Sequence, residues 1–161
     1  MEVVLVRVDD RLIHGQVAMG WTRTVRANHI LVANDQVASD KTQQMLLKMA
    51  TPVGVKSTIV SVANAATILR ENKLGRDRVI VLVRDPQSLL GLIEAGCTIE
   101  KVNIGNVRMT DGRERLTKEV AATPEEIKAW KQLDQSGVQL EAIWLPGGPA
   151  TNFNQVIRAH E

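Results

Sequence analysis

Short runs of β-branched and aliphatic residues recur along the chain, separated by stretches in which apolar positions repeat at helical spacing. Several runs are apolar at consecutive positions, which is typical of parallel strands covered on both faces. This alternation predicts an α/β fold: a single domain over residues 1–161, with a doubly wound, mostly parallel sheet and helices on both faces. The predicted strands are Val3–Val8, Ile30–Asn34, Lys56–Val62, Val79–Val83, Val102–Ile104 and Gln139–Leu145.

Capping residues mark the expected starts of the helices. Asp85 and Thr123 are each followed by a proline, which suits the first helical turn, and Glu126 would complete a capping box with Thr123. Gly96 and Gly137 would end these two helices. Further helices are expected to start at Ser39-Asp40 and at Ser61 or Asn64, and a first helix to run through Val17, Met19, Trp21 and Val25.

A turn signal in the second half of the chain predicts one more feature. Asp111-Gly112 separates two short runs, Val107–Met109 and Glu114–Leu116. We therefore expect a small hairpin appended to the parallel sheet.

Several conspicuous side chains are expected to have no catalytic or binding role. We expect Met45, Met49, Trp21, Trp130, Trp144 and Cys97 to pack in or against the core, and His29 and His160 to be inert surface residues.

Composition narrows the classes of function. The 161 residues carry a formal net charge of +2 and only 2% are aromatic, so neither a polyanion-binding surface nor base-stacking platforms are expected, and nucleic acid is excluded as a partner. The single cysteine excludes an intramolecular disulfide and a thiolate metal cluster. No apolar run reaches the length of a signal sequence or a membrane span, so the cytoplasm is the expected location.

The loop after the first predicted strand carries the residues with the clearest chemistry. His14 lies just before a predicted helix, where free backbone N–H groups favour an anion, and Gly15 would let that anion approach closely. Arg11 offers a planar donor fork for phosphate oxygens. Asp9 or Asp10 could hold one ring nitrogen of His14 and leave the other as a nucleophile. These parts would suit a phosphorylated imidazole.

Polar residues at other strand ends could line the same loop, because the carboxyl ends of parallel strands meet at one edge of the sheet. They are Asn34, Asp35, Arg84 and Asn106. The same residue types are common in ordinary turns and helix caps, so this rim remains one of two interpretations.

Other kinds of functional site can be tested by whether the sequence contains their motifs. The sequence has no nucleotide-binding glycine loop, no zinc-ligand spacing and no GxSxG elbow, so no metal and no cofactor are expected. Asp9-Asp10 could bind Mg²⁺ in a phosphoaspartyl receiver, but Val60-Ser61-Val62 stands where a receiver needs its acceptor aspartate. A non-catalytic regulatory module that senses an anion is the other alternative.

The segment Val6–Val17, VRVDDRLIHGQV, closely resembles the start of one transporter family. That family comprises the IIB components of the mannose/fructose/sorbose/N-acetylgalactosamine class of the bacterial phosphoenolpyruvate-dependent sugar phosphotransferase system. The resemblance extends to Leu31–Asp35, Asn103–Asn106 and Leu116–Val120 and covers nearly the whole chain.

The resemblance implies a phosphocarrier. His14 falls on the histidine that the family phosphorylates on Nδ1, so the phosphoryl group would be carried transiently without a cofactor. Asp10 and Arg11 fall on loop residues that contact the phosphoryl group or order the loop, and Gly15 and Gln16 fall on the start of the helix.

The resemblance also implies partners. The donor would be a IIA phosphohistidine, expected on a separate chain because this sequence starts directly at the IIB motif. The acceptor would be a hexose or amino sugar entering through the IIC and IID membrane components, which would hold the protein at the inner face of the membrane. Nothing in the sequence identifies the sugar.

Overall fold

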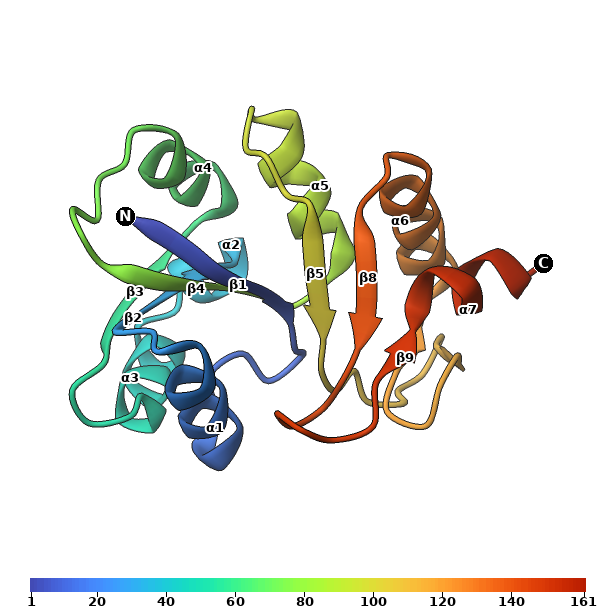
Figure 1. Ribbon diagram of the computed structural model, residues 1–161, viewed down its shortest axis with the longest axis horizontal. Helices are drawn as coiled ribbons and strands as arrows, with labels where there is room; N and C mark the ends of the chain where they lie inside the picture. The colour runs from blue at the N-terminus through green and yellow to red at the C-terminus, as the bar shows by residue number, and fades with distance from the viewer.

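The computed structural model describes residues 1–161, and its main sheet has seven strands in the order β3-β2-β4-β1-β5-β8-β9 (Figure 1). All neighbouring strands are parallel except β9, which runs antiparallel to β8. The strands are β1 (Glu2–Val8), β2 (His29–Ala33), β3 (Lys56–Val60), β4 (Arg78–Val83), β5 (Lys101–Ile104), β8 (Gln139–Ala142) and β9 (Thr151–Asn152). The doubly wound, mostly parallel sheet is confirmed.

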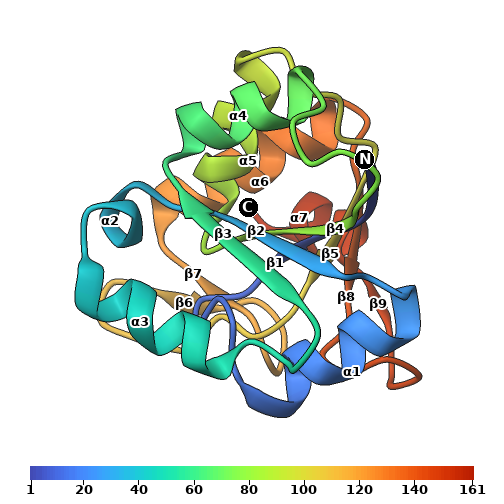
Figure 2. The ribbon, with the colours of Figure 1, turned by 90° about the vertical axis from the view of Figure 1, so that its left-hand side faces the viewer.

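Helices cover both faces of the sheet, as predicted. Figure 2 shows α4, α5 and α6 on one side of the strands and α1 and α3 on the other. The helices are α1 (Gly15–Val25), α2 (Asp35–Ala38), α3 (Lys41–Ala50), α4 (Val62–Arg70), α5 (Pro86–Glu94), α6 (Pro124–Gln135) and α7 (Phe153–Ala159). No helix is both long and apolar enough to cross a membrane.

The two layers of helices enclose two separate cores. Strand β4 contributes to both, because alternate side chains of a strand point to opposite faces. Val81 belongs to a cluster of 23 buried residues that also includes Trp130 of α6. Ile80 and Leu82 belong to a cluster of 9 buried residues beneath α1 and α3. Burial on both faces explains why these strands are apolar at consecutive positions.

The predicted caps form. Asp85 accepts from the backbone N–H of Ser88, and Thr123 and Glu126 make the reciprocal capping box. Of the two candidate starts for α4, the cap is Ser61, which accepts from the N–H of Asn64. Strand β3 therefore ends at Val60, earlier than predicted, because Ser61 already belongs to the helix start.

The small hairpin exists, but its position was predicted wrongly. Its strands are β6 (Glu114–Arg115) and β7 (Ala121–Ala122), and its turn follows Leu116 rather than lying at Asp111-Gly112. The first run instead makes a parallel bridge, Val107 to Val120. Burial of Val120, Ala121 and Ala122 determines this pairing, because it places these apolar residues in the core.

Two other packing expectations were wrong. Met45 and Met49 are 61% and 76% exposed, because α3 turns Leu47 toward the sheet instead. Trp21 and Trp130 are buried and Trp144 is half-buried, with 48% of its surface exposed, as expected.

His29 is not a surface residue. It is 5% exposed, with Nδ1 2.8 Å from Asp77 Oδ2 and Nε2 2.7 Å from Thr58 Oγ1. Its position at the start of the buried β2 encloses the ring, and polar neighbours satisfy both of its nitrogens. His160 is only partly exposed and lies 3.1 Å from Glu114.

Candidate functional site

The candidate site lies at the carboxyl end of β1, the central strand. The chain leaves β1 through α1 on one face of the sheet, whereas α5 connects β4 to β5 across the other face. Connections that diverge in this way leave a crevice at the strand ends, where ligands bind in open α/β sheets. The loop in this crevice is anchored by Asp9, whose N–H donates to Val83 O, and by Asp10, whose N–H donates to Asn106 O.

His14 is the residue at the cap position of α1. Its backbone is extended and its side chain makes no capping hydrogen bond. The N–H groups of Gly15, Gln16 and Val17 donate to no group of the protein. They leave an open helix start with unsatisfied donors and the positive end of the helix dipole beside the imidazole.

The backbone of the loop enters the left-handed region on either side of His14. Leu12 has φ of 59°, which is strained for a residue with a Cβ, and Gly15 has φ of 37°, which a glycine adopts readily. Leu12 and Ile13 are each 2% exposed, and their burial in the smaller core holds the loop in this conformation. His14 is therefore held by packed neighbours on the amino-terminal side of the helix.

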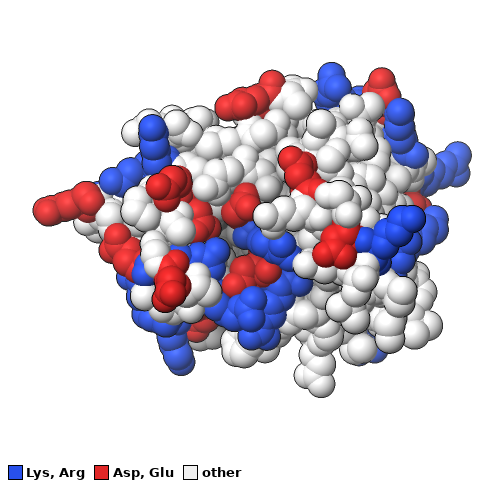
Figure 3. Space-filling view, turned by 180° about the vertical axis from the view of Figure 1, so that it is seen from behind, with Lys and Arg blue, Asp and Glu red and all other residues white.

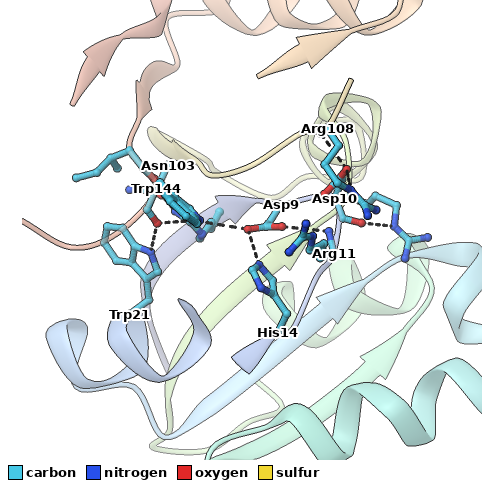
Figure 4. Close-up of polar contacts among 11 residues, drawn as sticks. Asp9, Asp10, Arg11, His14, Trp21, Asn103, Arg108 and Trp144 are labelled. Carbon is cyan, nitrogen blue, oxygen red and sulfur yellow. Dashed lines mark hydrogen bonds and ion pairs between the residues drawn. The ribbon is translucent and has the colours of Figure 1, made fainter. Parts of the chain in front are cut away.

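Asp9 is the carboxylate that contacts the imidazole, which decides between Asp9 and Asp10. Its Oδ2 lies 3.2 Å from His14 Nε2, and its Oδ1 accepts from the N–H of Arg11 at 3.0 Å (Figure 4). A carboxylate only accepts hydrogen bonds, so Nε2 must donate. Nδ1 makes no hydrogen bond to the protein, and the His14 side chain is 24% exposed. Nδ1 is thus the free nitrogen.

Asp10 points to different partners. Its Oδ2 accepts from the N–H and the Nε of Arg108, both at 3.0 Å, and lies 3.9 Å from Arg113. Arg84 donates to its backbone carbonyl. Asp10 therefore ties the first loop to the loop after β5 and makes no contact with the imidazole.

The Arg11 guanidinium is exposed and makes no hydrogen bond or ion pair within the protein. It does not neutralise Asp9 or Asp10, although both lie next to it in the sequence. Its donors are therefore unpaired.

Of the four residues predicted to line the site, two adjoin the first loop and two lie at the starts of other helices. Arg84 and Asn106 contact the backbone of Asp10 and so adjoin the first loop. Asn34 instead caps α2, and Asp35 accepts from the N–H of Val62 at the start of α4. Gly15 and Gln16 are exposed at the start of α1.

Sequence reasoning missed Arg7. It is 2% exposed, lies 3.6 Å from Asp9 Oδ2, and donates to the carbonyls of Ile143 and Trp144. Burial lowers the pKa of Arg7 to about 10, an effect that the neighbouring Asp9 carboxylate opposes, so the guanidinium is charged at neutral pH. The only signal in the sequence is an arginine inside the apolar run of the first strand.

No group of three or more His, Cys, Asp or Glu side chains converges to hold a metal ion.

Fold and site together define a doubly wound α/β domain with a histidine in the loop after its central strand. The chain belongs to the family described as PTS system sorbose subfamily IIB component, whose profile matches residues 3–161. It is a IIB component of the sorbose/mannose class of the sugar phosphotransferase system, and IIB components are phosphotransferases.

Relatives of nearly equal length share about a third of their residues with the chain. The fructose-specific EIIB component of Bacillus subtilis is 35% identical over 158 residues, which are 98% of this chain and 97% of that protein. The mannose-specific EIIAB component of Escherichia coli is 36% identical over 157 residues, but these are only 49% of that protein. The crystal structure of the IIBSor domain of the sorbose permease from Klebsiella pneumoniae superposes with a TM-score of 0.93 at 33% identity, covering 100% of this chain and 99% of that chain.

Proposed function

We propose that the protein is a phosphocarrier that accepts a phosphoryl group on His14 Nδ1 and passes it to a sugar. The single observation that carries the proposal is the arrangement of the ring: Asp9 holds Nε2, and Nδ1 is free beside the unsatisfied N–H groups of α1. A neutral imidazole with its proton on Nε2 has its nucleophilic lone pair on Nδ1.

The transfer step needs no cofactor, because the bonds, electron pairs and protons balance between the two histidines. The donor is a phosphohistidine whose other ring nitrogen is protonated. As the His14 Nδ1–P bond forms, the donor N–P bond breaks and its electron pair stays on the donor nitrogen, which leaves a neutral imidazole. His14 becomes a phosphoimidazolium that keeps its proton on Nε2. The buried Asp9 carboxylate faces that new positive charge at 3.2 Å.

The helix start and Arg11 supply donors for the phosphoryl oxygens. Phosphoryl transfer needs in-line positioning and stabilisation of charge on these oxygens. Arg11 and the N–H groups of Gly15 and Gln16 form a cradle of moderate strength. Moderate strength suits a carrier, because tight binding of the phosphorylated state would slow the onward step.

The proposed donor is a IIA phosphohistidine, and the proposed acceptor is a hexose or amino sugar entering through IIC and IID. The name of the mannose-specific EIIAB relative supports the pairing, since that protein joins a IIA and a IIB part. We place the protein in the cytoplasm, held peripherally at the inner face of the membrane by IIC and IID.

Labelling from a phosphorylated IIA protein tests the proposal. The wild type should take up acid-labile, alkali-stable phosphate, His14→Ala should take up none, and the matched control His160→Ala should label normally. Undiminished labelling of His14→Ala would refute the assignment of the site.

The alternative, a regulatory module that only senses an anion, predicts binding without turnover. Phosphorylated wild type added to membranes containing IIC, IID and sugar should lose its label to the sugar if the protein is a carrier. Retention of the label on the protein would favour the regulatory module.

A further inference from the structure

Arg7 is a charged side chain enclosed in the middle of the sheet, directly behind the candidate site. It extends from β1 and reaches three groups on distant segments, Asn103 Oδ1 on β5 and the carbonyls of Ile143 and Trp144 at 2.9 and 2.8 Å, and it lies 3.6 Å from Oδ2 of the nearby Asp9. Its guanidinium also lies 5.0 Å from the centre of the Trp21 ring. The buried charge therefore has several polar partners.

A buried charge of this kind is not explained by stability alone. Removing an arginine from water is unfavourable, and well-packed apolar side chains of similar volume often stabilise a core at least as well. Asp9, Arg7's charged partner, is 1% exposed and also contacts His14. The ion pair is therefore placed where it acts on the imidazole.

Gly105 provides the space for this arrangement. A Cβ at residue 105 would lie 2.7 Å from the Arg7 Cζ and 2.8 Å from Asp9 Oδ2, which is closer than real Cβ atoms approach other atoms. The φ of Gly105 is not in the left-handed region, so the glycine is required by the close approach and not by the turn.

We propose that Arg7 is a positioning residue for His14: it holds the Asp9 carboxylate on Nε2 and thereby keeps Nδ1 as the free, nucleophilic nitrogen. This deepens the proposed phosphocarrier function and rests on it for its effect on transfer. Gly105 belongs to the same device, since it leaves the two side chains room to meet.

The physical reason is that Arg7 is the only permanently charged side chain paired with Asp9, whose other side-chain partner is the imidazole. Without Arg7, a buried carboxylate would be left with an uncompensated charge, and it would turn to water or take up a proton. In either case its Oδ2 would stop selecting one tautomer of His14. The carbonyls of Ile143 and Trp144 fix Arg7 in turn, so the loop after β8 supports the imidazole from a distance.

Nitrogen NMR of the imidazole tests the tautomer directly and needs no phosphoryl donor. The His14 signals are assigned by their absence in His14→Ala, and the variants are Arg7→Met, Arg7→Lys and the milder Asn103→Ala. We expect the proton to reside on Nε2 in the wild type, to be shared between both nitrogens in Arg7→Met, and to return in part in Arg7→Lys. The matched control is Arg78→Met, because Arg78 also donates to two backbone carbonyls but at the other end of the sheet.

Transfer from a phosphorylated IIA protein gives the second readout. Arg7→Met should slow transfer on the order of 10- to 100-fold, the range found when a partner that orients a metal-bound imidazole is removed. Gly105→Ala should slow it as well, although it removes no polar group, while Gly91→Ala on α5 should not.

The outcomes separate this proposal from the proposed function. If Arg7→Met fails to fold, Asn103→Ala and Gly105→Ala decide by the same two readouts. An unchanged tautomer in the folded variants overturns the proposal, even if their transfer is slow, because Arg7 would then act by another route. Absence of phosphorylation in the wild type would refute the carrier function, yet a disturbed tautomer in Arg7→Met would still establish the positioning.

Discussion

At the scale of single residues, two adjacent aspartates in one loop have different roles because their surroundings differ. Asp9 is enclosed between Arg7 and His14, whereas Asp10 faces Arg108. The two side chains therefore contact different segments, β1 and the start of α1 for Asp9 and the loop after β5 for Asp10. The same residue type can thus orient an imidazole at one position and join two loops at the next.

Replacing each aspartate by asparagine should separate these roles. We expect Asp9→Asn to reduce transfer by about 10- to 100-fold, because the amide can present an N–H to Nε2 and no longer selects one tautomer. Asp10→Asn should mainly lower the free energy of unfolding, by about 1–2 kcal/mol, through weaker bonds to Arg108. Urea unfolding and stopped-flow transfer on both variants measure the two effects. Equal losses of transfer would contradict the division of roles.

Arg11 allows a quantitative test, since its guanidinium has no partner in the free protein. Loss of one charge-assisted bond to the phosphoryl group, worth about 1.5–3 kcal/mol, would slow transfer by roughly 10- to 150-fold in Arg11→Ala. Arg11→Lys should recover only part of the rate, because an ammonium lacks the planar fork. Stability should change by no more than about 0.5 kcal/mol. A transfer rate within about threefold of wild type would show that Arg11 does not hold the phosphoryl group.

At the scale of elements, the two ends of the parallel strands carry different chemistry. The carboxyl ends hold the His14 loop, while the amino ends of β2, β3 and the loop before β4 are joined by a polar cluster. In that cluster Asp77 contacts His29 at 2.8 Å and Lys56 at 3.1 Å. These contacts connect three segments that are not adjacent in the sequence.

This cluster predicts a pH dependence of stability. The hydrogen bond from His29, followed by that from Lys56, holds the pKa of Asp77 below its ordinary value. Because the folded protein depresses this pKa, the stabilisation is present above the ordinary aspartate pKa of about 3.9 and is lost as the pH falls through the lower folded value. Asp77→Asn should therefore be less stable than wild type at neutral pH, and the difference should shrink at about pH 2–3. Urea unfolding at both pH values measures it, and a difference independent of pH would contradict the assignment.

At the scale of the whole molecule, the proposed carrier function requires His14 to meet a donor and an acceptor in turn, so both partners would use the face around His14. Arg84, Arg108 and Arg113 lie around Asp10, so positive charge adjoins the edge of the site. Seen from behind, the molecule has basic side chains gathered with a few acidic ones in its lower middle, and a broad region largely free of charge at the lower right (Figure 3).

We expect the IIA partner to dock on this face through a modest, transient interface of at most about 1,200 Å² in total. Chemical-shift mapping with the IIA protein should mark Arg11–Gln16 and the loops that begin at Asn34 and Arg84. The amino ends of the strands, including His29 and Asp77, should be unaffected and serve as the internal control. Shifts confined to those ends would place the interface elsewhere.

Features that depend on neighbours along the chain could be predicted from the amino-acid sequence. Apolar runs located the buried strands, and Asp85 and Thr123 marked helix starts because a cap bonds only two or three residues ahead. The loop from Asp9 to Gly15 was recognisable as a candidate site for the same reason, since a histidine beside a helix start is a local arrangement.

Contacts between segments distant in sequence became apparent only in the folded chain. Arg7 meets carbonyls 136 and 137 residues away, His29 is enclosed by Asp77 48 residues away, and Val107 bridges to Val120 instead of to the nearer run. Each of these contacts forms because the fold buries polar groups that must then find partners, or apolar groups that leave water together. Local periodicity contains no information on which segments will meet, and for that reason the contacts of Arg7 were visible only in the folded chain.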